Sequence, residues 1–332
     1  MQNISRRIVV IGTGGTIAGT AASQHDHTGY TAGQVGIGDL LRGLPGVDAA
    51  TLETEQVAQL DSKDMDHATW QRLAQRLAHH LARDEVAGAV VVHGTDTLEE
   101  TAWFLQRVLA PAKPVVLTAA MRPASALNPD GPQNLIDAVL VAGSTGARGV
   151  VAVIAGQVIA GGDLRKLHPY RLDAFGSGDG GPLGVVEQGR LRRFRDWPEA
   201  QTGSGAIHRA LSLDTDDWPW VEIVTSRAGV DQRQFDLLVD AGVDGIVIAA
   251  TGNGTVHRVF DAPIRRALDK GIAVVRSTRC VFGGLIGAEA DSLLRLDTAP
   301  PWPTVLGAGP LSPVQARIEL MLALLRLRPP AG

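Results

Sequence analysis

Several features that mark a particular class of protein are missing or scarce in this sequence. It contains a single cysteine, Cys280, among 332 residues, so no disulfide can close within the chain. No apolar run reaches the roughly 20 residues that a membrane-spanning helix requires. The formal net charge is −4 without a strongly basic block, so the charge pattern of a nucleic-acid-binding protein is also absent. We therefore expect neither a membrane nor a nucleic acid as a partner.

Aromatic residues are few as well, at 4%, whereas glycine is abundant, with 39 residues, and 45% of the chain is hydrophobic. This balance suits an α/β protein with many tight connections between strands and helices, and the length suffices for two domains. The segment 1–7 leads directly into the first apolar strand, without the apolar core of a signal peptide. We expect a cytoplasmic protein; a chain trimmed of its leader would look the same, which keeps the periplasm open.

Strand and helix patterns alternate along both halves of the chain. Between 66 and 83, apolar residues recur at the spacing of one helical face. The first half is predicted to contain further helices at 98–109 and 133–141 and strands at 86–92, 114–118 and 149–155. The second half is predicted to contain strands at 221–225, 245–250 and 272–276 and helices at 232–241 and 259–270. A last helix is predicted to begin with a capping box formed by Ser312 and Gln315.

A polar stretch without periodicity, 196–219, lies between these two series of elements and indicates an interdomain linker. The predicted organisation is an N-terminal catalytic α/β domain at 1–200, a linker at 201–219 and a C-terminal α/β domain at 220–332.

Two segments run from a buried strand straight into a turn rich in glycine and threonine. They are IVVIGTGGTIAG at 8–19 and VVVHGTDTLEET at 90–101. Thr16 and Thr95 follow the carboxyl ends of these strands, where open α/β sheets bind their ligands. Two hydroxyls, the adjacent Asp96 and the amides of a helix start suit attack on a carbonyl group. The pattern therefore favours a hydrolase.

Nucleotide binding is the main competing interpretation of the first segment. A dinucleotide fingerprint requires glycines spaced G-x-G-x-x-G; Gly12 and Gly14 fit, but the third position is Ile17. A phosphate-binding P-loop requires a lysine after the glycines, and none follows here. The glycines are predicted instead to leave space for a carboxamide close to Thr16.

Together these motifs resemble those of the bacterial-type L-asparaginases, a family that includes glutaminase-asparaginases. The matching segments extend over nearly the whole chain: GGTIAG at 14–19, HGTDTLEET at 93–101, AMRP at 120–123, DGPQNL at 130–135, TGNGT at 251–255 and VVRSTR at 274–279. The resemblance implies a larger N-terminal domain with a mixed sheet and a smaller, flavodoxin-like C-terminal domain. It also implies hydrolysis of L-asparagine to L-aspartate and ammonia through a threonine acyl-enzyme, without a cofactor, by a homotetramer built as a dimer of intimate dimers.

The resemblance further implies roles for the catalytic residues. Thr16 matches the primary nucleophile, and Tyr30, in the small-residue loop 19–36, matches a lid residue that assists it. Thr95, Asp96 and Lys166 match a catalytic triad. By sequence alone, Thr16 also suits a helix N-cap and Lys166 a surface lysine. Which threonine attacks first stays open, as does whether Lys166 acts as a base or as a charged orienting group.

Substrate-binding residues follow from the same resemblance. Ser62 matches a serine that holds the substrate α-carboxylate, and Thr95 and Asp96 also face the substrate. Lys63 departs from the family, many of whose members carry Gln or another uncharged or acidic residue there, and its charge would repel the substrate ammonium unless it points away. Asn253 matches a position near the amino-group site, and Glu289 matches a glutamate donated by the neighbouring subunit.

Three other interpretations are weighed against this one. The histidines have poor spacing for a metal site, so we expect none; they are His25, His27, His79, His80, His93 and His168. Within the enzyme class, a glutaminase-asparaginase or an amidase for another small amide is the alternative. Outside it, a non-catalytic amino-acid-binding protein on the same fold is the alternative, although a binding protein needs no nucleophile.

Overall fold

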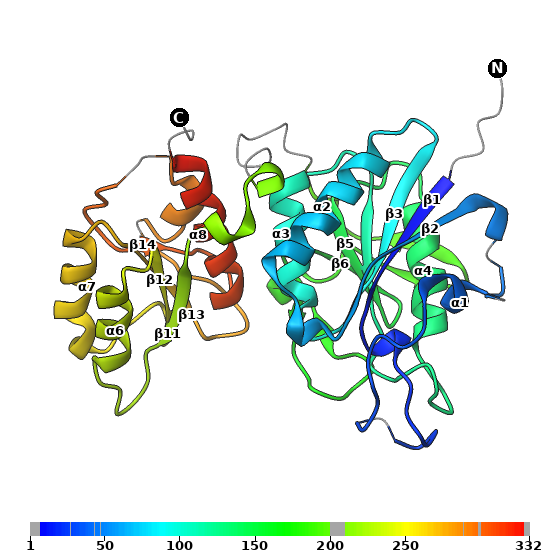
Figure 1. Cartoon of the computed structure of the whole chain (residues 1–332), viewed down its shortest axis with the longest axis horizontal. Helices are drawn as coiled ribbons and strands as arrows, with labels where there is room; N and C mark the ends of the chain where they lie inside the picture. Colours follow the sequence, from blue (N-terminus) through cyan, green and yellow to red (C-terminus); the bar gives the residue numbers. More distant parts are fainter. Residues whose placement is uncertain are drawn as a thin grey trace. The chain divides into compact units, whose positions relative to one another are not determined.

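The computed structural model describes residues 7–26, 28–42, 44–46, 48–199, 210–287, 289–297 and 300–328. The chain divides into two compact units, Met1–Gly203 and Ser204–Gly332, and each has its own sheet (Figure 1). Positions 201–209 of the predicted linker lie outside the described residues. Within the described ranges, no helix is long and apolar enough to cross a membrane.

The first unit is built on an eight-stranded mixed sheet. Its strands are β1 (Arg7–Gly14), β2 (Leu52–Leu60), β3 (Val86–Val92), β4 (Val115–Thr118), β5 (Val150–Ile154), β6 (Gln157–Ala160), β9 (Gly184–Glu187) and β10 (Arg190–Arg193), in the order β10-β9-β6-β5-β4-β3-β1-β2. Strands β1 to β5 are parallel, whereas β6, β9 and β10 pair antiparallel. The mixed sheet that the resemblance implies is confirmed.

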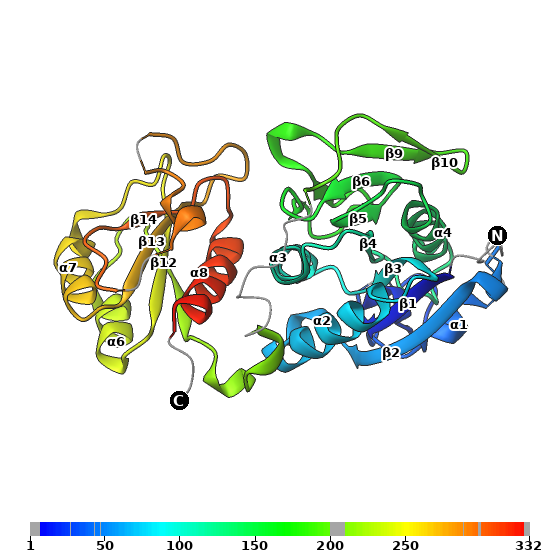
Figure 2. The same cartoon turned by 90° about the horizontal axis from the view of Figure 1, so that it is seen from above.

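Helices cover both faces of this sheet. Helices α2 (His67–Leu81) and α3 (Leu98–Leu109) pack on one face, and α1 (Ile37–Leu41) and α4 (Gly131–Ala142) on the other (Figure 2). Because the central strands are buried on both faces, they are almost continuously apolar, which is why their positions could be predicted. A short ribbon of β7 (Arg165–Lys166) and β8 (Phe175–Gly176) lies outside the main sheet.

The second unit has a four-stranded, all-parallel sheet. Its strands are β11 (Val221–Thr225), β12 (Gly245–Ala250), β13 (Ala273–Thr278) and β14 (Leu306–Gly307), in that order. Helices α6 (Arg233–Ala241) and α7 (Asp261–Asp269) cover one face, and α8 (Pro313–Leu327) covers the other (Figure 2). This arrangement agrees with the flavodoxin-like domain that the resemblance implies.

The predicted capping box of the last helix is present. Ser312 Oγ accepts from the Gln315 backbone N–H, and Gln315 Oε1 accepts from the Ser312 N–H, both at 3.3 Å. The predicted strands 86–92, 221–225 and 245–250 and the helix 98–109 match the observed bounds.

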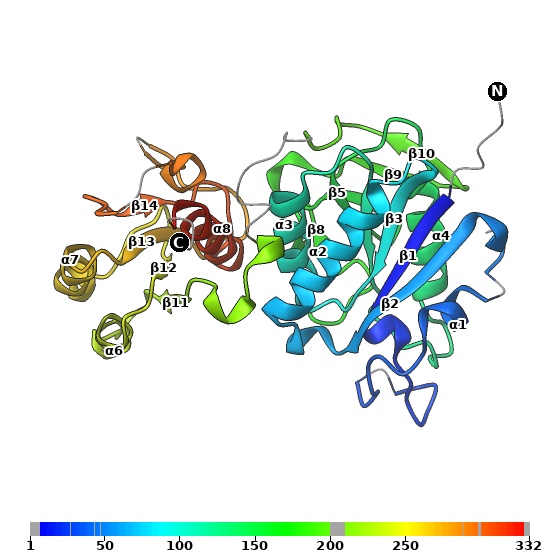
Figure 3. The same cartoon turned by 45° about the horizontal axis from the view of Figure 1, so that its top comes forward.

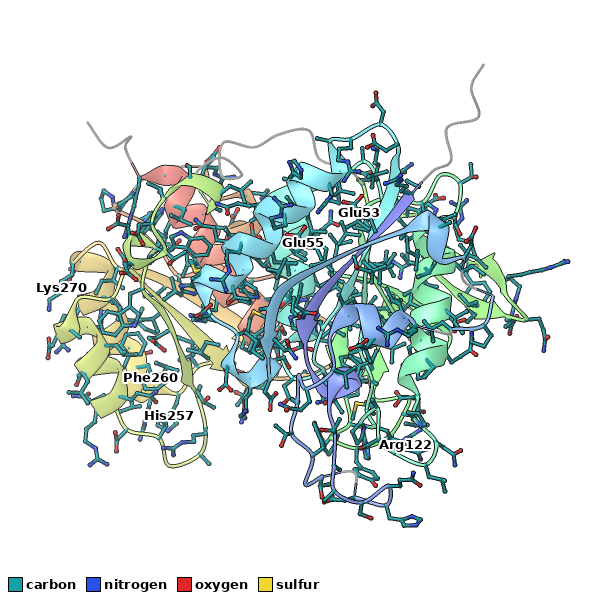
Figure 4. All side chains as sticks on the ribbon, turned by 45° about the vertical axis from the view of Figure 1, so that its right-hand side comes forward. Glu53, Glu55, Arg122, His257, Phe260 and Lys270 are labelled. Atoms are coloured by element: carbon teal, nitrogen blue, oxygen red, sulfur yellow. The ribbon has the colours of Figure 1, made fainter. Side chains whose placement is uncertain are left out.

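Two local expectations are wrong or incomplete. After Thr16 the chain forms only one 3₁₀ turn, Thr16–Ala18, rather than a longer helix. Strand β2 was not predicted, because it is an edge strand whose polar residues hide the alternation. Its Glu53 and Glu55, labelled in Figure 4, pair with basic side chains of the segment 76–83.

Candidate active site

Three neighbouring parallel strands end at the same edge of the large sheet. Strand β1 lies between β3 and β2, as Figure 3 shows, so the loops that follow these strands start side by side. The loop after β1 carries Thr16, the loop after β2 carries Ser62 and the loop after β3 carries Thr95 and Asp96. Such an edge is where ligands bind in open α/β sheets.

Glycines let the three loops touch. A Cβ atom on Gly15, whose φ is +85°, would collide with the backbone of Gly94. A Cβ atom on Gly94 would collide with the Ser62 hydroxyl, and one on Gly14 would collide with the Leu60 backbone. Neighbouring protein atoms thus occupy the positions that side chains would take here, and space for a substrate carboxamide close to Thr16 stays a prediction. The glycines bring Thr16, Ser62 and Thr95 together.

Thr16 and Tyr30 form a hydroxyl pair. Their oxygens lie 2.6 Å apart, and Thr16 is 6% exposed. The alternative role of Thr16 as a helix N-cap is wrong, because Gly15 occupies that position and no side chain caps the turn. The pairing expected for a nucleophile and its assisting residue is thus present in the geometry.

Contacts with the loop after β4 hold the segment that carries Tyr30. Thr20 and Thr31 pair through their backbones, closing the loop at its base. The Ala21 N–H donates to Ser125 Oγ at 2.8 Å, and the Ala124 N–H donates to the Gly19 carbonyl at 2.9 Å. No local pattern in the sequence indicates the role of Ser125, because its partner lies 104 positions away.

The second set of side chains is Thr95, Asp96 and Lys166. Lys166 Nζ donates to Thr95 Oγ1 at 2.8 Å and to Asp96 Oδ1 at 2.5 Å. The backbone of Lys166 is fixed in turn, because its N–H donates to Glu99 Oε2 at 2.9 Å. Burial raises the pKa of the Glu99 carboxyl above its usual range. The sequence suggested Glu99 only as a favourable charge at a helix start, and its contact with Lys166 was missed.

Ser62 lies beside Gly94 and Asp96 and is 1% exposed. Its Oγ accepts from the Asp96 backbone N–H at 3.1 Å, and its carbonyl accepts from the Thr97 hydroxyl at 2.8 Å. In the first of these bonds Ser62 is the acceptor, so its own hydroxyl hydrogen is not used there. The hydroxyl is thereby fixed beside the backbone that carries Thr95.

Lys63 follows Ser62, but its side chain is 61% exposed and turns to the acids of its own 3₁₀ turn. Its Nζ lies 2.9 Å from Asp61 Oδ2 and 3.0 Å from Asp64 Oδ2. Hydrogen bonds to these carboxylates raise the pKa of the Lys63 ammonium. Two negative charges therefore offset the positive charge that departs from the family pattern.

Asn253 and Glu289 belong to the second unit. Asn253 lies in a turn between Gly252 and Gly254, both with positive φ, and its amide exchanges two hydrogen bonds with the Ile286 backbone, at 2.9 and 3.1 Å. Glu289 has a left-handed backbone, with φ of 60°, and its carboxylate lies 3.6 Å from Arg295. Asn253 thus holds the loop that leads to Glu289. Contact of either residue with a substrate stays a prediction.

Among the residues that the structure describes, no three His, Cys, Asp or Glu side chains gather where they could hold a metal ion. His80 Nε2 lies 2.6 Å from Glu55 Oε2, whereas His79 is exposed and its ring lies edge-on to that of His80, with centroids 5.3 Å apart. His168 Nδ1 accepts two backbone N–H groups. His93 is fully buried next to Gly94. His27 lies outside the described residues.

Comparison with known proteins assigns the two halves of the chain to matching families. Residues 7–199 match the family described as "Asparaginase, N-terminal", and residues 220–331 match the "Glutaminase/Asparaginase C-terminal domain". L-asparaginase 2 of Escherichia coli is 36% identical, over 97% of this chain and 90% of that protein. The glutaminase-asparaginase of Pseudomonas fluorescens is 35% identical, over 96% and 86%.

A solved structure has the same fold. The crystal structure of a probable cytoplasmic L-asparaginase from Campylobacter jejuni superposes with a TM-score of 0.85 at 34% identity, and the match covers 96% of this chain and 95% of that one.

Proposed function

The chain belongs to the asparaginase family of amidohydrolases, and we propose on this basis that it hydrolyses L-asparagine to L-aspartate and ammonia. One observation carries the proposal: the loop of the Thr16–Tyr30 pair touches, at Gly15 and Gly94, the loop of Thr95 and Asp96, both of which bind Lys166. A hydrolase that forms and then cleaves an acyl-enzyme needs both a nucleophile and a group that aligns water.

In the first half of the proposed reaction, Thr16 Oγ1 attacks the carbon of the side-chain amide. Tyr30 Oη, at 2.6 Å, relays the proton of the Thr16 hydroxyl toward the departing nitrogen. Backbone amides of the turn that begins at Thr16 stabilise the oxyanion. The C–N bond breaks, ammonia leaves and a β-aspartyl ester remains on Thr16.

In the second half, a water attacks the ester and releases aspartate. Lys166 donates to the Thr95 oxygen, so the hydroxyl hydrogen of Thr95 can point toward the substrate and the water. Because Lys166 also binds Asp96, we favour an orienting role for the lysine. Mass spectrometry of the trapped ester identifies the nucleophile: an adduct on Thr95 instead of Thr16 would exchange the two roles.

The α-carbon end of the substrate would be bound by neighbouring polar groups. The Asp96 carboxylate suits an ammonium group, and the Ser62 hydroxyl suits a carboxylate. With this end fixed, one extra methylene displaces the amide from Thr16, and a displacement near 1 Å costs about 10²-fold in rate. Asparagine should therefore be preferred over glutamine.

Ammonia release from asparagine and glutamine, measured side by side, tests the assignment. We expect kcat/KM to favour asparagine by about 10²-fold. Equal values would make the chain a glutaminase-asparaginase, the activity named for the P. fluorescens relative. No ammonia from either amide, with aspartate still bound, would favour a non-catalytic binding protein.

For the assembly and cellular location, we propose a homotetramer in the cytoplasm. The asparaginase fold and the similarity to the C. jejuni protein, which is called a probable cytoplasmic L-asparaginase, support the proposal. Sedimentation velocity tests the assembly, because a fully active monomer would contradict it. Fractionation of cells that express the gene from its native start codon tests the location, and recovery from the periplasm would contradict it.

A further inference from the structure

A chain of hydrogen bonds between buried side chains ends at the loop that carries Thr95. Trp70 Nε1, from α2, donates to Thr101 Oγ1 on α3 at 2.8 Å. Thr101 Oγ1 lies 3.0 Å from His93 Nε2, and His93 Nδ1 lies 2.7 Å from the Gly94 carbonyl oxygen. The exposed fractions are 4% for Trp70 and 0% for Thr101 and His93.

The chemistry of the two ends fixes the direction of this chain. The Trp70 indole N–H can only donate, and the Gly94 carbonyl can only accept. His93 therefore carries its hydrogen on Nδ1 and donates it to Gly94, while Nε2 accepts from the Thr101 hydroxyl. Every polar atom of the three side chains is then paired. Burial lowers the pKa of His93 to about 4, so the imidazole is neutral at neutral pH.

Gly94 is where the parts of the candidate site converge. Its backbone packs against Gly15, which precedes Thr16, and against the Ser62 side chain, with no room for a Cβ atom. Thr95 and Asp96 follow it directly. A rotation of the peptide after Gly94 would therefore move the Thr95 hydroxyl and the Asp96 N–H that binds Ser62.

We propose that His93 is a positioning residue: held by Thr101 and Trp70, it fixes the Gly94 carbonyl and so aligns Thr95 and Asp96 with Thr16 and Ser62. The proposal rests on the amide hydrolysis proposed above. It differs from simple satisfaction of buried polar groups, which would contribute to stability and leave the rate of the folded enzyme unchanged.

Packing alone does not account for the arrangement. The Trp70 ring stacks on Phe104 at 5.0 Å between centroids, and this contact would persist if the Thr101 hydroxyl were absent. The hydrogen bonds, rather than the ring contact, connect α2 and α3 to the loop after β3. Removal of the Thr101 hydroxyl therefore tests the positioning role of the hydrogen bonds while the ring contact stays in place.

The first test compares two substitutions of the same chemistry. Thr101→Val interrupts the chain, whereas Thr69→Val removes a 2%-exposed hydroxyl on α2 that binds Arg72 instead. Each should lower the melting temperature, because each loses a hydrogen bond of a buried threonine. Only Thr101→Val should lower kcat for asparagine, by about 10-fold or more, with a smaller change in KM. If the two variants keep the same kcat as the unaltered chain, the buried chain is purely structural and the proposal fails.

The second test uses His93 itself. Asparagine at position 93 can still donate to the Gly94 carbonyl from Nδ2, whereas leucine cannot. We expect His93→Asn to retain at least 10-fold more kcat than His93→Leu. If both variants fold and are equally inactive, the hydrogen bond to the Gly94 carbonyl does not account for the loss of kcat, and the proposal is wrong. Should His93→Leu fail to fold, the Thr101→Val comparison still decides.

A control distinguishes failure of this proposal from failure of the proposed function. The unaltered chain is assayed first on asparagine and glutamine, and aspartate binding is measured by calorimetry for every variant. If the unaltered chain releases no ammonia but binds aspartate, the hydrolytic function is rejected. Positioning is then judged from the aspartate Kd, which Thr101→Val should raise relative to Thr69→Val; equal Kd values would reject it.

Discussion

The ammonium nitrogen of Lys166 lies 2.8 Å from the hydroxyl oxygen of Thr95, although the two residues are 71 positions apart. The contact depends on the short ribbon of β7 and β8, which lies outside the main sheet, and on Glu99, which binds the Lys166 backbone. The lysine is thus held at its backbone and at its side chain. This double restraint suits a group that must orient a hydroxyl.

Replacement of Thr16 by Ala should abolish turnover and leave aspartate binding largely intact, because only the attacking hydroxyl is lost. Tyr30→Phe should reduce kcat, on the order of 10²-fold, since the 2.6 Å hydroxyl contact disappears. The measurement is ammonia release at saturating asparagine. Thr20→Ala is the matched control, because Thr20 pairs with Thr31 through its backbone. Near-normal activity of Thr16→Ala would show that the nucleophile lies elsewhere.

Thr95→Val and Lys166→Met should each lower kcat on the order of 10²–10⁴-fold, the range of positioned acid–base groups. The double variant should lose little more than either single one, because residues that act as a unit are not additive. The double-mutant cycle is measured by steady-state kinetics of the unaltered chain, the two single variants and the double variant. Fully additive losses would indicate that Lys166 acts independently of Thr95.

We expect the charge of Lys63 to have little effect on the KM for asparagine in this chain. The sequence predicts that Lys63→Gln lowers KM, but the ammonium is bound by Asp61 and Asp64, so the structure predicts less than about a 3-fold change. Asp61→Asn combined with Asp64→Asn should raise KM by freeing the lysine, and adding Lys63→Gln should restore it. A large fall in KM for Lys63→Gln alone would show that the lysine does face the substrate.

The stability of the enzyme should depend on His93 at acidic pH. Its pKa is about 4 in the folded protein against 6.5 in the unfolded chain, so the unfolded state binds the proton first as the pH falls. Above pH 6.5, His93 is neutral in both states and does not lower the free energy of unfolding. As the pH falls from 6.5 to about 4, protonation of the unfolded state lowers this free energy by about 3 kcal/mol in total.

Denaturant unfolding of the parent and of His93→Asn at pH 7 and pH 4.5 measures this difference. The comparison cancels the contributions of Glu99 and Asp137, because both proteins contain them. Their raised pKa values stabilise the folded state as the pH falls, which is opposite to the effect of His93. Equal losses of stability in the two proteins would contradict the assignment of the effect to His93.

If the neighbouring subunit supplies Glu289, two inactive chains should complement each other. Thr16→Ala and Glu289→Ala chains, mixed and reassembled, would form some sites that carry neither substitution. Activity should therefore reappear in the mixed oligomer, as measured by ammonia release after purification with two different tags. Mixed oligomers without restored activity would reject the shared site.

Local patterns in the sequence determine much of this fold. The central strands are apolar because both of their faces are buried, and helix α8 begins where Ser312 and Gln315 cap it. The edge strand β2 could not be recognised, because its stabilising pairs with Arg76 and Arg83 join residues 21 and 30 positions apart.

The sequence by itself also determined where the two hydroxyls of the proposed mechanism lie along the chain, because Thr16 and Thr95 directly follow strands that their own apolar runs define. Only the tertiary structure decided what each hydroxyl contacts. The order β3-β1-β2 brings three loops together, Gly15 and Gly94 let their backbones touch, and Lys166 arrives from a separate ribbon. Hydrogen bonds depend on distances of about 3 Å, and proximity between distant segments is set by packing of the whole unit rather than by any local pattern.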